Sequence, residues 1–312
     1  MGLSKTLSYE SWVESTAEQK QSLCNEIAAR IAEPQFTFTG LKSHRYCERE
    51  EVLGLFEHAG KEFVLIPANE AAIGFDVNEF RPTDAQKESF TQGQEEVRDV
   101  VPVTMPEFLE RFTTRSRTVK VGSMLVECVP EKPSRLPADP NLPEVQTLMR
   151  GEASRLSEFR SEFIHDDEGA RKEIVVWRER SITRKEIEEE IRAQKFRLPT
   201  SDEWEYLCGG GATTLFRWGD NNPSDWRENA AYRYDRNCFF LDIAHDTYAL
   251  EAVTEPDVFR GGDGGGAECS GDPIFYTWFP LATAFLCRSL ANPQPEMHWS
   301  DRFQVRRVFD LE

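Results

Sequence analysis

Apolar residues recur at helical spacing close to the N-terminus. Leu23, Ile27 and Ile31 follow one another every four residues, and Thr16 stands three residues before a glutamine, which is the spacing of an N-terminal capping box. Pro34 then interrupts the repeat, because proline has no backbone N–H to donate within a helix. The pattern predicts one helix with a narrow apolar stripe, within a helical N-terminal extension over residues 1–60.

The middle of the chain, residues 78–194, is rich in charge and in helix signals. Thr104 and Thr183 each stand three residues before a glutamate and directly before an apolar helical repeat. Leu156, Phe159 and Phe163 have helical spacing as well. We therefore expect a charged helical insertion over about residues 78–194 in a main domain that covers residues 61–312.

Strand patterns are fewer. Residues 62–75 contain a β-branched and aromatic run, turn-forming residues and a second short apolar run, which predicts a strand pair. Residues 119–129 alternate between apolar and polar positions and predict one more strand. Four prolines within residues 132–143 predict a linker or surface loop.

Composition changes at Phe196, after which 117 residues hold 20 of the 35 aromatic side chains. Glycine clusters at 209–211 and 261–266 interrupt this region, which favours short strands and long ordered loops over periodic helices. Because aromatic side chains bury large apolar areas, the region should contain the principal core or a deep binding surface.

Charge excludes some classes of partner. The 312 residues include 37 Lys and Arg against 55 Asp and Glu, a formal net charge of −18, and no basic patch offsets it. Such a chain repels phosphate backbones and anionic lipid, and its apolar runs are shorter than the roughly 20 residues of a membrane span, so we expect neither nucleic-acid nor membrane binding. Seven cysteines without C-x-x-C spacing, and a start without a signal-peptide pattern, are typical of reduced thiols in a cytoplasmic protein.

The most informative segment is FRLPTSDEWEYLCGGG, residues 196–211. Pro199 keeps the residue before it extended, Thr200 and Glu203 have capping-box spacing, and Gly209 ends the apolar repeat. The segment therefore predicts one short, rigid and buried helix.

Within this segment, RLPTSDEWEY resembles the RLPTEAEWEY signature of the formylglycine-generating enzyme (sulfatase-modifying factor) family. Over residues 60–76 and 196–308 the resemblance implies an α+β domain with a variant of the C-type lectin fold. Five further segments resemble the family's landmarks in the same order: FVLIPANEAAIGFD at 63–76, RWGD at 217–220, NCFFL at 237–241, RGG at 260–262 and RFQVR at 302–306.

The resemblance does not extend to the family's metal ligands. Phe275 and Pro280 fall near the positions of the two copper-binding cysteines. Ala249 takes the place of the glutamate that helps to bind a structural calcium ion, a cation that needs six to eight oxygen ligands. Three acidic residues near this position are weak candidates for replacement calcium ligands, namely Asp242, Asp246 and Glu251.

We therefore expect a non-catalytic or diverged binding protein whose C-terminal aromatic and glycine-rich loops contact a protein or a small-molecule ligand. The alternative is a metal-dependent oxidase, with copper or non-heme iron in a rearranged site built from Cys269, Cys287, His245 or His298. A third possibility is a subunit of a larger assembly that oligomerises through the N-terminal helix. Aromatic and polar side chains on the C-terminal loops are the candidate ligand contacts: Trp218, Tyr248, Asp263, Tyr276, Trp278, His298 and Trp299.

Overall fold

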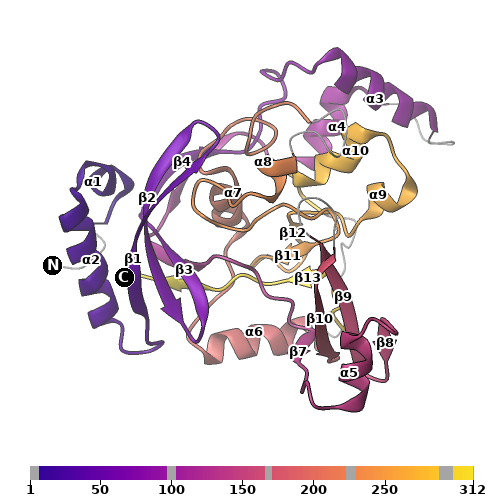
Figure 1. Ribbon diagram of the computed structural model, residues 1–312. Helices are drawn as coiled ribbons and strands as arrows, with labels where there is room; N and C mark the ends of the chain where they lie inside the picture. Colours follow the sequence, from indigo (N-terminus) through magenta and orange to yellow (C-terminus); the bar gives the residue numbers. More distant parts are fainter. Residues whose placement is uncertain (1–6, 97–102, 166–170, 223–229, 288–297, 312) are drawn as a thin grey trace.

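A five-stranded antiparallel sheet lies toward one side of the molecule, next to its N-terminal helices (left in Figure 1). The computed structural model describes residues 7–96, 103–165, 171–222, 230–287 and 298–311. They form a mixed α+β structure, which confirms the α+β class. The sheet has the order β1-β2-β3-β6-β14. Its strands are β1 (Thr37–Tyr46), β2 (Arg49–His58), β3 (Lys61–Ile66), β6 (Met124–Glu127) and β14 (Val308–Asp310).

The sheet separates two hydrophobic cores. Along β3, Phe63 and Leu65 point into one core, whereas Val64 and Ile66 point into the other, because successive side chains of a strand alternate between its faces. All four are buried, which explains why this strand reads as a continuous apolar run.

Two helices pack on the outer strands, α1 (Tyr9–Glu14) and α2 (Ala17–Arg30) (Figure 1). The predicted capping box is present, with the Thr16 side chain and that of Gln19 each bonded to the other's backbone. The prediction of a wholly helical extension over residues 1–60 is wrong, because β1 and β2 belong to the five-stranded sheet. Neither strand has clear alternation, and their pairing with each other and with β3 stabilises them.

The segment 78–194 contains strands as well as helices, so the description of it as a helical insertion is also wrong. Its strand β6 lies between β3 and β14 in the five-stranded sheet, and β5 (Arg117–Val121) pairs with β4 (Asn69–Ile73). The capping boxes at Thr104 and Thr183 are present. The helices are α3 (Asp84–Glu96), α4 (Met105–Phe112), α5 (Pro143–Met149) and α6 (Arg184–Ala193).

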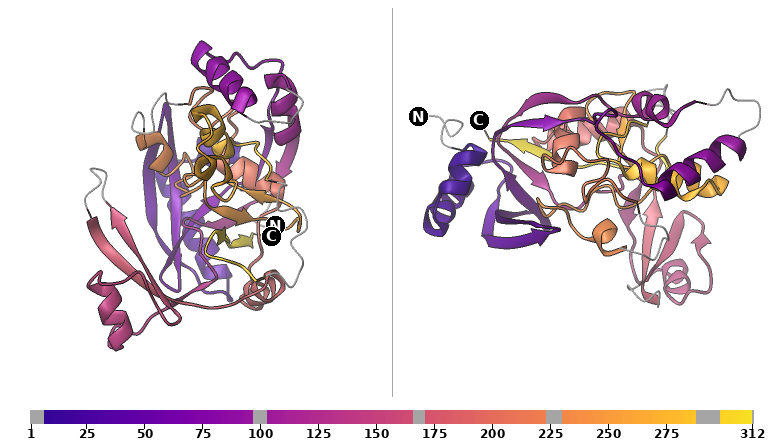
Figure 2. Two further views of the ribbon diagram at one scale, coloured as in Figure 1. Left: turned by 90° about the vertical axis from the view of Figure 1, so that its right-hand side faces the viewer. Right: turned by 90° about the horizontal axis from the view of Figure 1, so that it is seen from above.

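Residues 135–165 and 171–179 form a small lobe that projects from one end of the molecule, and we call it the appended lobe (Figure 2). Its core consists of Val145, Leu148 and Phe159. The predicted helix through Leu156 and Phe159 is a tight hairpin instead, in which these two residues pair across Ser157 with its positive φ of 52°. The strands have the order β7-β10-β9-β8, and they are β7 (Arg135–Pro137), β8 (Arg155–Leu156), β9 (Phe159–His165) and β10 (Arg171–Glu179).

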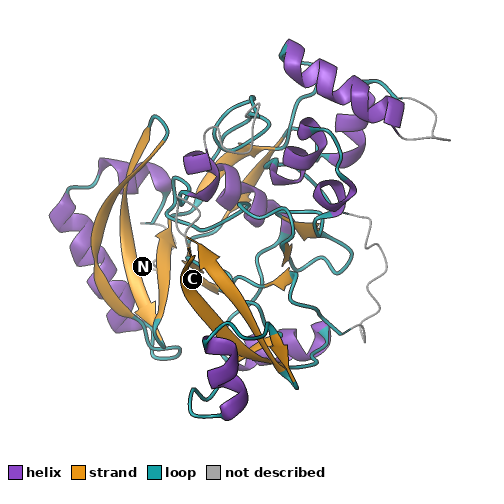
Figure 3. Ribbon diagram, turned by 45° about the vertical axis from the view of Figure 1, so that its right-hand side comes forward, coloured by secondary structure: helices purple, strands orange, loops and turns teal. Residues whose placement is uncertain are grey.

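The C-terminal region consists of short elements joined by long loops, as its glycine-rich composition predicts (Figure 3). The helix of the RLPTSDEWEY segment is fully buried along its second half, and Gly210 ends it in the left-handed conformation. The aromatic run that follows the second glycine cluster forms a short helix, Ile274–Trp278. The elements are α7 (Ser201–Gly209), α8 (Ala230–Tyr234), β11 (Leu250–Ala252), β12 (Phe259–Arg260), α9 (Gly266–Ser270), α10 (Ile274–Trp278), a 3-10 turn (Phe279–Leu281) and β13 (Phe303–Gln304).

Across these described ranges, no helix is both long enough and apolar enough to cross a membrane.

Candidate binding pocket

A pocket of about 330 Å³ lies where α4, α9 and α10 meet, and we call it the aromatic pocket. Three separate stretches of the chain contribute to it: α4, the glycine-rich α9 segment and the region from α10 to Cys287. Its volume is at the lower end of the range of small-molecule sites. The residues that line it are Phe108, Phe112, Asp263, Gly266, Ala267, Ser270, Asp272, Tyr276, Phe279, Pro280, Phe285, Leu286 and Cys287.

The wall of the aromatic pocket is a cluster of rings. The Phe108 ring lies 4.9 Å from Phe112, 5.2 Å from Tyr276 and 5.1 Å from Phe279, measured between centroids. Phe279 in turn contacts Phe285 edge to face, with centroids 5.2 Å apart. Ring pairs at these distances stabilise one another beyond the area that they bury, so the wall is a preformed apolar surface.

Tyr276 is held in place from α3. Its ring stacks on Phe90 with an interplanar angle of 12°, and its hydroxyl donates to the Phe90 carbonyl and accepts from the Gln94 side chain. Gly93 makes this packing possible, because a Cβ atom there would lie 2.3 Å from the Tyr276 ring. Tyr276 was predicted as a ligand contact, and the structure places it in the pocket wall.

Asp263 is the second predicted contact that lines the pocket. Its carboxylate accepts hydrogen bonds from the backbone N–H groups of Gly266 and Ala267, both at 2.9 Å, and so caps α9. The preceding Gly262 lies against backbone, since a Cβ atom there would be 2.1 Å from the carbonyl oxygen of Ala249. The glycine cluster therefore fixes an acidic group on the pocket rim.

Three of the predicted contacts are packed within the protein. Trp278 and Trp299 are 0% and 3% exposed, so neither is available to a ligand, and these two assignments are wrong. Trp299 stacks on Phe303. Trp218 is half-buried, stacks on Phe216 and meets Trp278 edge to face. The sequence alone does not show which aromatic rings are buried and which are exposed. In the folded protein most of these rings pack in the core.

The remaining two predicted contacts do not line the aromatic pocket. The Tyr248 ring packs over Gly265, and its hydroxyl accepts a hydrogen bond from the Cys269 thiol at 3.3 Å. His298 is exposed, and its Nδ1 lies 2.7 Å from the Ser181 hydroxyl oxygen. Both side chains lie at the surface with polar partners of their own.

The calcium candidates do not fit a calcium ion. Glu251 is 3% exposed and paired with Arg306 at 2.7 Å, and Asp242 lies 2.6 Å from Nδ1 of His245. Asp246 accepts a hydrogen bond from the backbone N–H of Tyr248. The cavity that these residues share measures about 10 Å³, enough for about one water molecule, and the Arg260 guanidinium lines it and repels cations.

The residues of the alternative metal site have separate partners. Cys269 is exposed and bonded to Tyr248, whereas Cys287 is buried in the wall of the aromatic pocket. His245 pairs with Asp242. Within the part of the chain that the structure describes, no group of three or more His, Cys, Asp or Glu side chains is placed to hold a metal ion.

Sequence reasoning did not assign Phe108, Phe112 and Phe285 to the site. The first two were recognised as the apolar stripe of a helix, but nothing in the local pattern indicates that this stripe contacts a segment more than 160 residues away. A comparison with protein-family models and one with curated proteins each found no match.

Proposed function

We propose that this protein is a binding protein on a C-type-lectin-like scaffold similar to that of the formylglycine-generating enzyme family, and that the aromatic pocket receives an apolar group of its ligand. The observation that carries the proposal is the convergence of the aromatic and glycine-rich C-terminal segments on one preformed pocket of about 330 Å³. Because the pocket wall is aromatic and its rim holds Asp263, an aromatic or aliphatic group with a polar or cationic end suits it.

Contacts between the family-like segments support the scaffold assignment. Glu205 of the RLPTSDEWEY segment pairs with Arg260 of the RGG segment. Asn237 of the NCFFL segment donates through its amide nitrogen to the carbonyl oxygens of Leu207 and Cys208 on the same buried helix. Three of the six segments, which are distant in sequence, thus bond to one another, as parts of a common fold would do.

Residue identities support a binding role over copper oxidase chemistry at this place. Phe275 is buried in the core and Pro280 lines the aromatic pocket, and neither supplies the thiolate that a soft copper ion requires. One of the two positions thus lies in the pocket wall and the other in the core behind it, and both supply apolar contact.

Binding of small aromatic probes tests the proposal. Indole and 4-methylphenol would be titrated against the protein by saturation-transfer NMR, with the wild type compared with Phe112→Asp. Phe112 is half-buried in the pocket wall, so an aspartate there places a charge in the apolar cavity and should weaken binding at least tenfold.

The matched control is Val13→Asp, a similar substitution at a 54% exposed position on α1. It should leave probe binding unchanged. Absence of probe binding by the wild type, or equal binding by Phe112→Asp, contradicts the proposal.

A further inference from the structure

The aromatic pocket has two kinds of wall. One side comes from α4, α10 and the residues that follow α10, and it carries the rings. The other side is the stretch from Asp263 to Asp272, which contains α9. The rings of Phe108, Phe112 and Tyr276 are half-buried, so part of each is open to the cavity. A ligand in this space can therefore contact the rings and the α9 segment together.

The rings form a curved surface. Phe108 is inclined by 48° to Phe112 and to Phe279, and by 72° to Tyr276. Since all four rings line one cavity, they approach it from different directions. The face of an aromatic ring attracts a cation that lies within about 6 Å of its centroid. One ring already has such a contact, because the guanidinium of the exposed Arg111 lies 5.6 Å from the Phe112 centroid.

The charged side chains of the aromatic pocket are both acidic. Asp263 and Asp272 line it, and none of the described residues that line it is Lys, Arg or His. The two carboxylates flank α9, a helix of five residues and therefore only about 7.5 Å long. The formal net charge of −18 for the whole chain adds to the negative potential around them. This charge pattern attracts cations and repels anions.

Hydrogen-bond donors beside the pocket are already used within the protein. The Tyr276 hydroxyl donates to the Phe90 carbonyl, and the Ser270 hydroxyl donates to the Gly266 carbonyl. The two backbone N–H groups at the start of α9 donate to Asp263. An anionic ligand group would have to displace one of these bonds. A cationic donor would not, because a carboxylate has about four lone-pair sites and Asp263 uses two of them.

The charge of Asp272 reaches the aromatic wall. Burial raises the pKa of the Tyr276 hydroxyl, and the negative charge of Asp272 raises it further, whereas the hydrogen bond from Gln94 opposes the shift. The acidic side and the aromatic side of the pocket are therefore close enough to act on one ligand.

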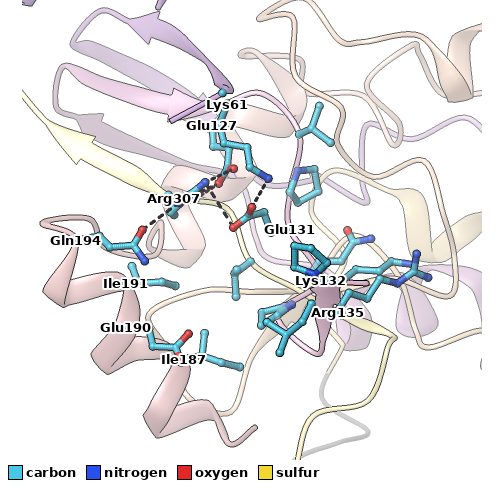
Figure 4. A pocket seen from close by; sticks show the side chains of 18 of the residues that line it. Lys61, Glu127, Glu131, Lys132, Arg135, Ile187, Glu190, Ile191, Gln194 and Arg307 are labelled. Carbon is cyan, nitrogen blue, oxygen red and sulfur yellow. Dashed lines mark hydrogen bonds and ion pairs between the residues drawn. The ribbon is translucent and has the colours of Figure 1, made fainter. Parts of the chain in front are cut away.

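A larger cavity elsewhere has a different charge pattern. It measures about 1030 Å³ and lies between the appended lobe, α6 and one end of the five-stranded sheet (Figure 4). Its charged groups have both signs, and the dashed lines in Figure 4 join Arg307 to Glu127 and Glu131. Lys61 pairs with Glu131 as well. Because these groups neutralise one another, a charged ligand would have to break an existing pair there.

From the acidic rim and the curved aromatic wall we infer that the aromatic pocket selects organic cations, and that its ligand is a small arylalkyl- or alkylammonium ion. The inference rests on the proposed binding function of this pocket and adds the charge of the ligand. The apolar group lies among the rings, and the ammonium donates to Asp263 in a charge-assisted hydrogen bond. The volume of about 330 Å³ suits a small ligand.

Three indoles with the same ring system and different charges test the inference. Tryptamine is a cation at pH 7, 3-ethylindole is neutral and indole-3-propionate is an anion. Titrated into the full chain, tryptamine should bind at least tenfold more tightly than indole-3-propionate, with 3-ethylindole between them. An ionic strength of about 0.5 M should reduce this ratio of affinities, because salt screens the charges at the rim.

Variants that remove one charge locate the effect. Asp263→Asn keeps an oxygen that can accept from the α9 backbone but loses the charge, so the ratio of tryptamine to indole-3-propionate affinity should fall at least fivefold. Asp272→Asn should lower the ratio as well, and it leaves the Asp263 cap of α9 intact. The matched control is Glu10→Gln, at an exposed position on α1, far from α10 in Figure 1. It should leave the ratio unchanged.

The possible outcomes separate this inference from the proposal on which it rests. Equal affinities for the three indoles, or tighter binding of the anion, would overturn the selection of cations and leave the apolar pocket in place. An unchanged ratio in both Asp263→Asn and Asp272→Asn would also overturn it, because the acidic rim would then not recognise the ligand. Binding of none of the three probes would contradict the proposed function itself.

Discussion

Glu205 accepts a hydrogen bond from Arg260 at 2.9 Å, and the two side chains are 1% and 0% exposed. Thr114 donates to the same carboxylate, and Arg260 also donates to Ser201 and to the Phe285 carbonyl. The pair joins the helix of the RLPTSDEWEY segment to the strand that leads into the glycine-rich rim of the aromatic pocket. It therefore links the scaffold to the site.

Removal of the Glu205 charge should destabilise the protein severely. In Glu205→Gln the Arg260 guanidinium stays buried without a counter-charge, and the expected loss of unfolding free energy is about 3–5 kcal/mol. Urea unfolding followed by fluorescence measures it. Glu70→Gln, which breaks the exposed pair with Lys120, is the control and should cost less than about 1 kcal/mol. Equal urea midpoints for the two variants would show that the buried pair stabilises the protein no more than the exposed pair does.

Gly93→Ala should destabilise the protein although the same change in an exposed helix interior stabilises by up to about 1 kcal/mol. The added methyl group would lie 2.3 Å from the Tyr276 ring, so the ring must leave its stacked position on Phe90. Overpacking of this kind costs about 1–3 kcal/mol.

Thermal unfolding of Gly93→Ala and of Gly122→Ala, where a Cβ atom meets nothing within 4 Å, provides the comparison. Weaker binding of indole by the first variant is expected too, because Tyr276 forms part of the pocket wall. An increase in melting temperature for Gly93→Ala would contradict the packing described above.

The seven cysteines should differ widely in reactivity. Cys269 is exposed, whereas burial raises the pKa of Cys24, Cys128 and Cys208 to about 12 in each case. Because the thiolate is the reactive form, a disulfide reagent at pH 8 should label Cys269 first and leave these three unmodified in the native state. Mass spectrometry identifies the site, and Cys269→Ser should remove the fast phase. Rapid labelling of Cys208 would mean that the core opens readily.

The appended lobe should loosen at acid pH. The hydrogen bonds from Arg135 lower the pKa of Glu162. The Arg135–Glu162 pair therefore contributes its full stability at pH values above the ordinary carboxyl pKa. This contribution is lost as the pH falls through the lowered pKa of Glu162 in the folded protein. Because the carboxylate is partly exposed, this contribution is less than about 1 kcal/mol. Glu162→Gln should melt below the wild type at pH 7 and together with it at about pH 3. A constant difference at both pH values would contradict this assignment.

Metal analysis separates the binding proposal from the oxidase alternative. Protein purified without a chelating tag should contain copper and iron well below one equivalent, because Cys269, His245 and His298 each have a separate partner. Near one equivalent of either metal, lost in Cys269→Ala or Cys287→Ala, would favour the oxidase.

Local sequence patterns predicted the starts of the helices well. The capping boxes at Thr16, Thr104, Thr183 and Thr200 are all present, because such a box involves residues only three positions apart. The same kind of reasoning gave a wrong result at Phe159, where helical spacing coincides with a hairpin. There the pairing with β10 and the small core of the appended lobe decided the structure.

The candidate sites were predicted only in part. Asp263 and Tyr276 were recognised from composition, since a glycine-rich turn and an aromatic run are visible in the chain itself. Phe108 reaches the same pocket from a segment that the sequence separates from it by more than 150 residues.

By itself, the sequence determined the charge of the protein, the boundaries of its capped helices and the presence of an aromatic-rich C-terminal region, since these depend on composition or on contacts a few residues apart. Only the tertiary structure decided which tryptophans are core, how Arg260 is neutralised and which side chains share a cavity. Those outcomes depend on burial and on pairing between distant segments, and neither is encoded in the order of neighbouring residues.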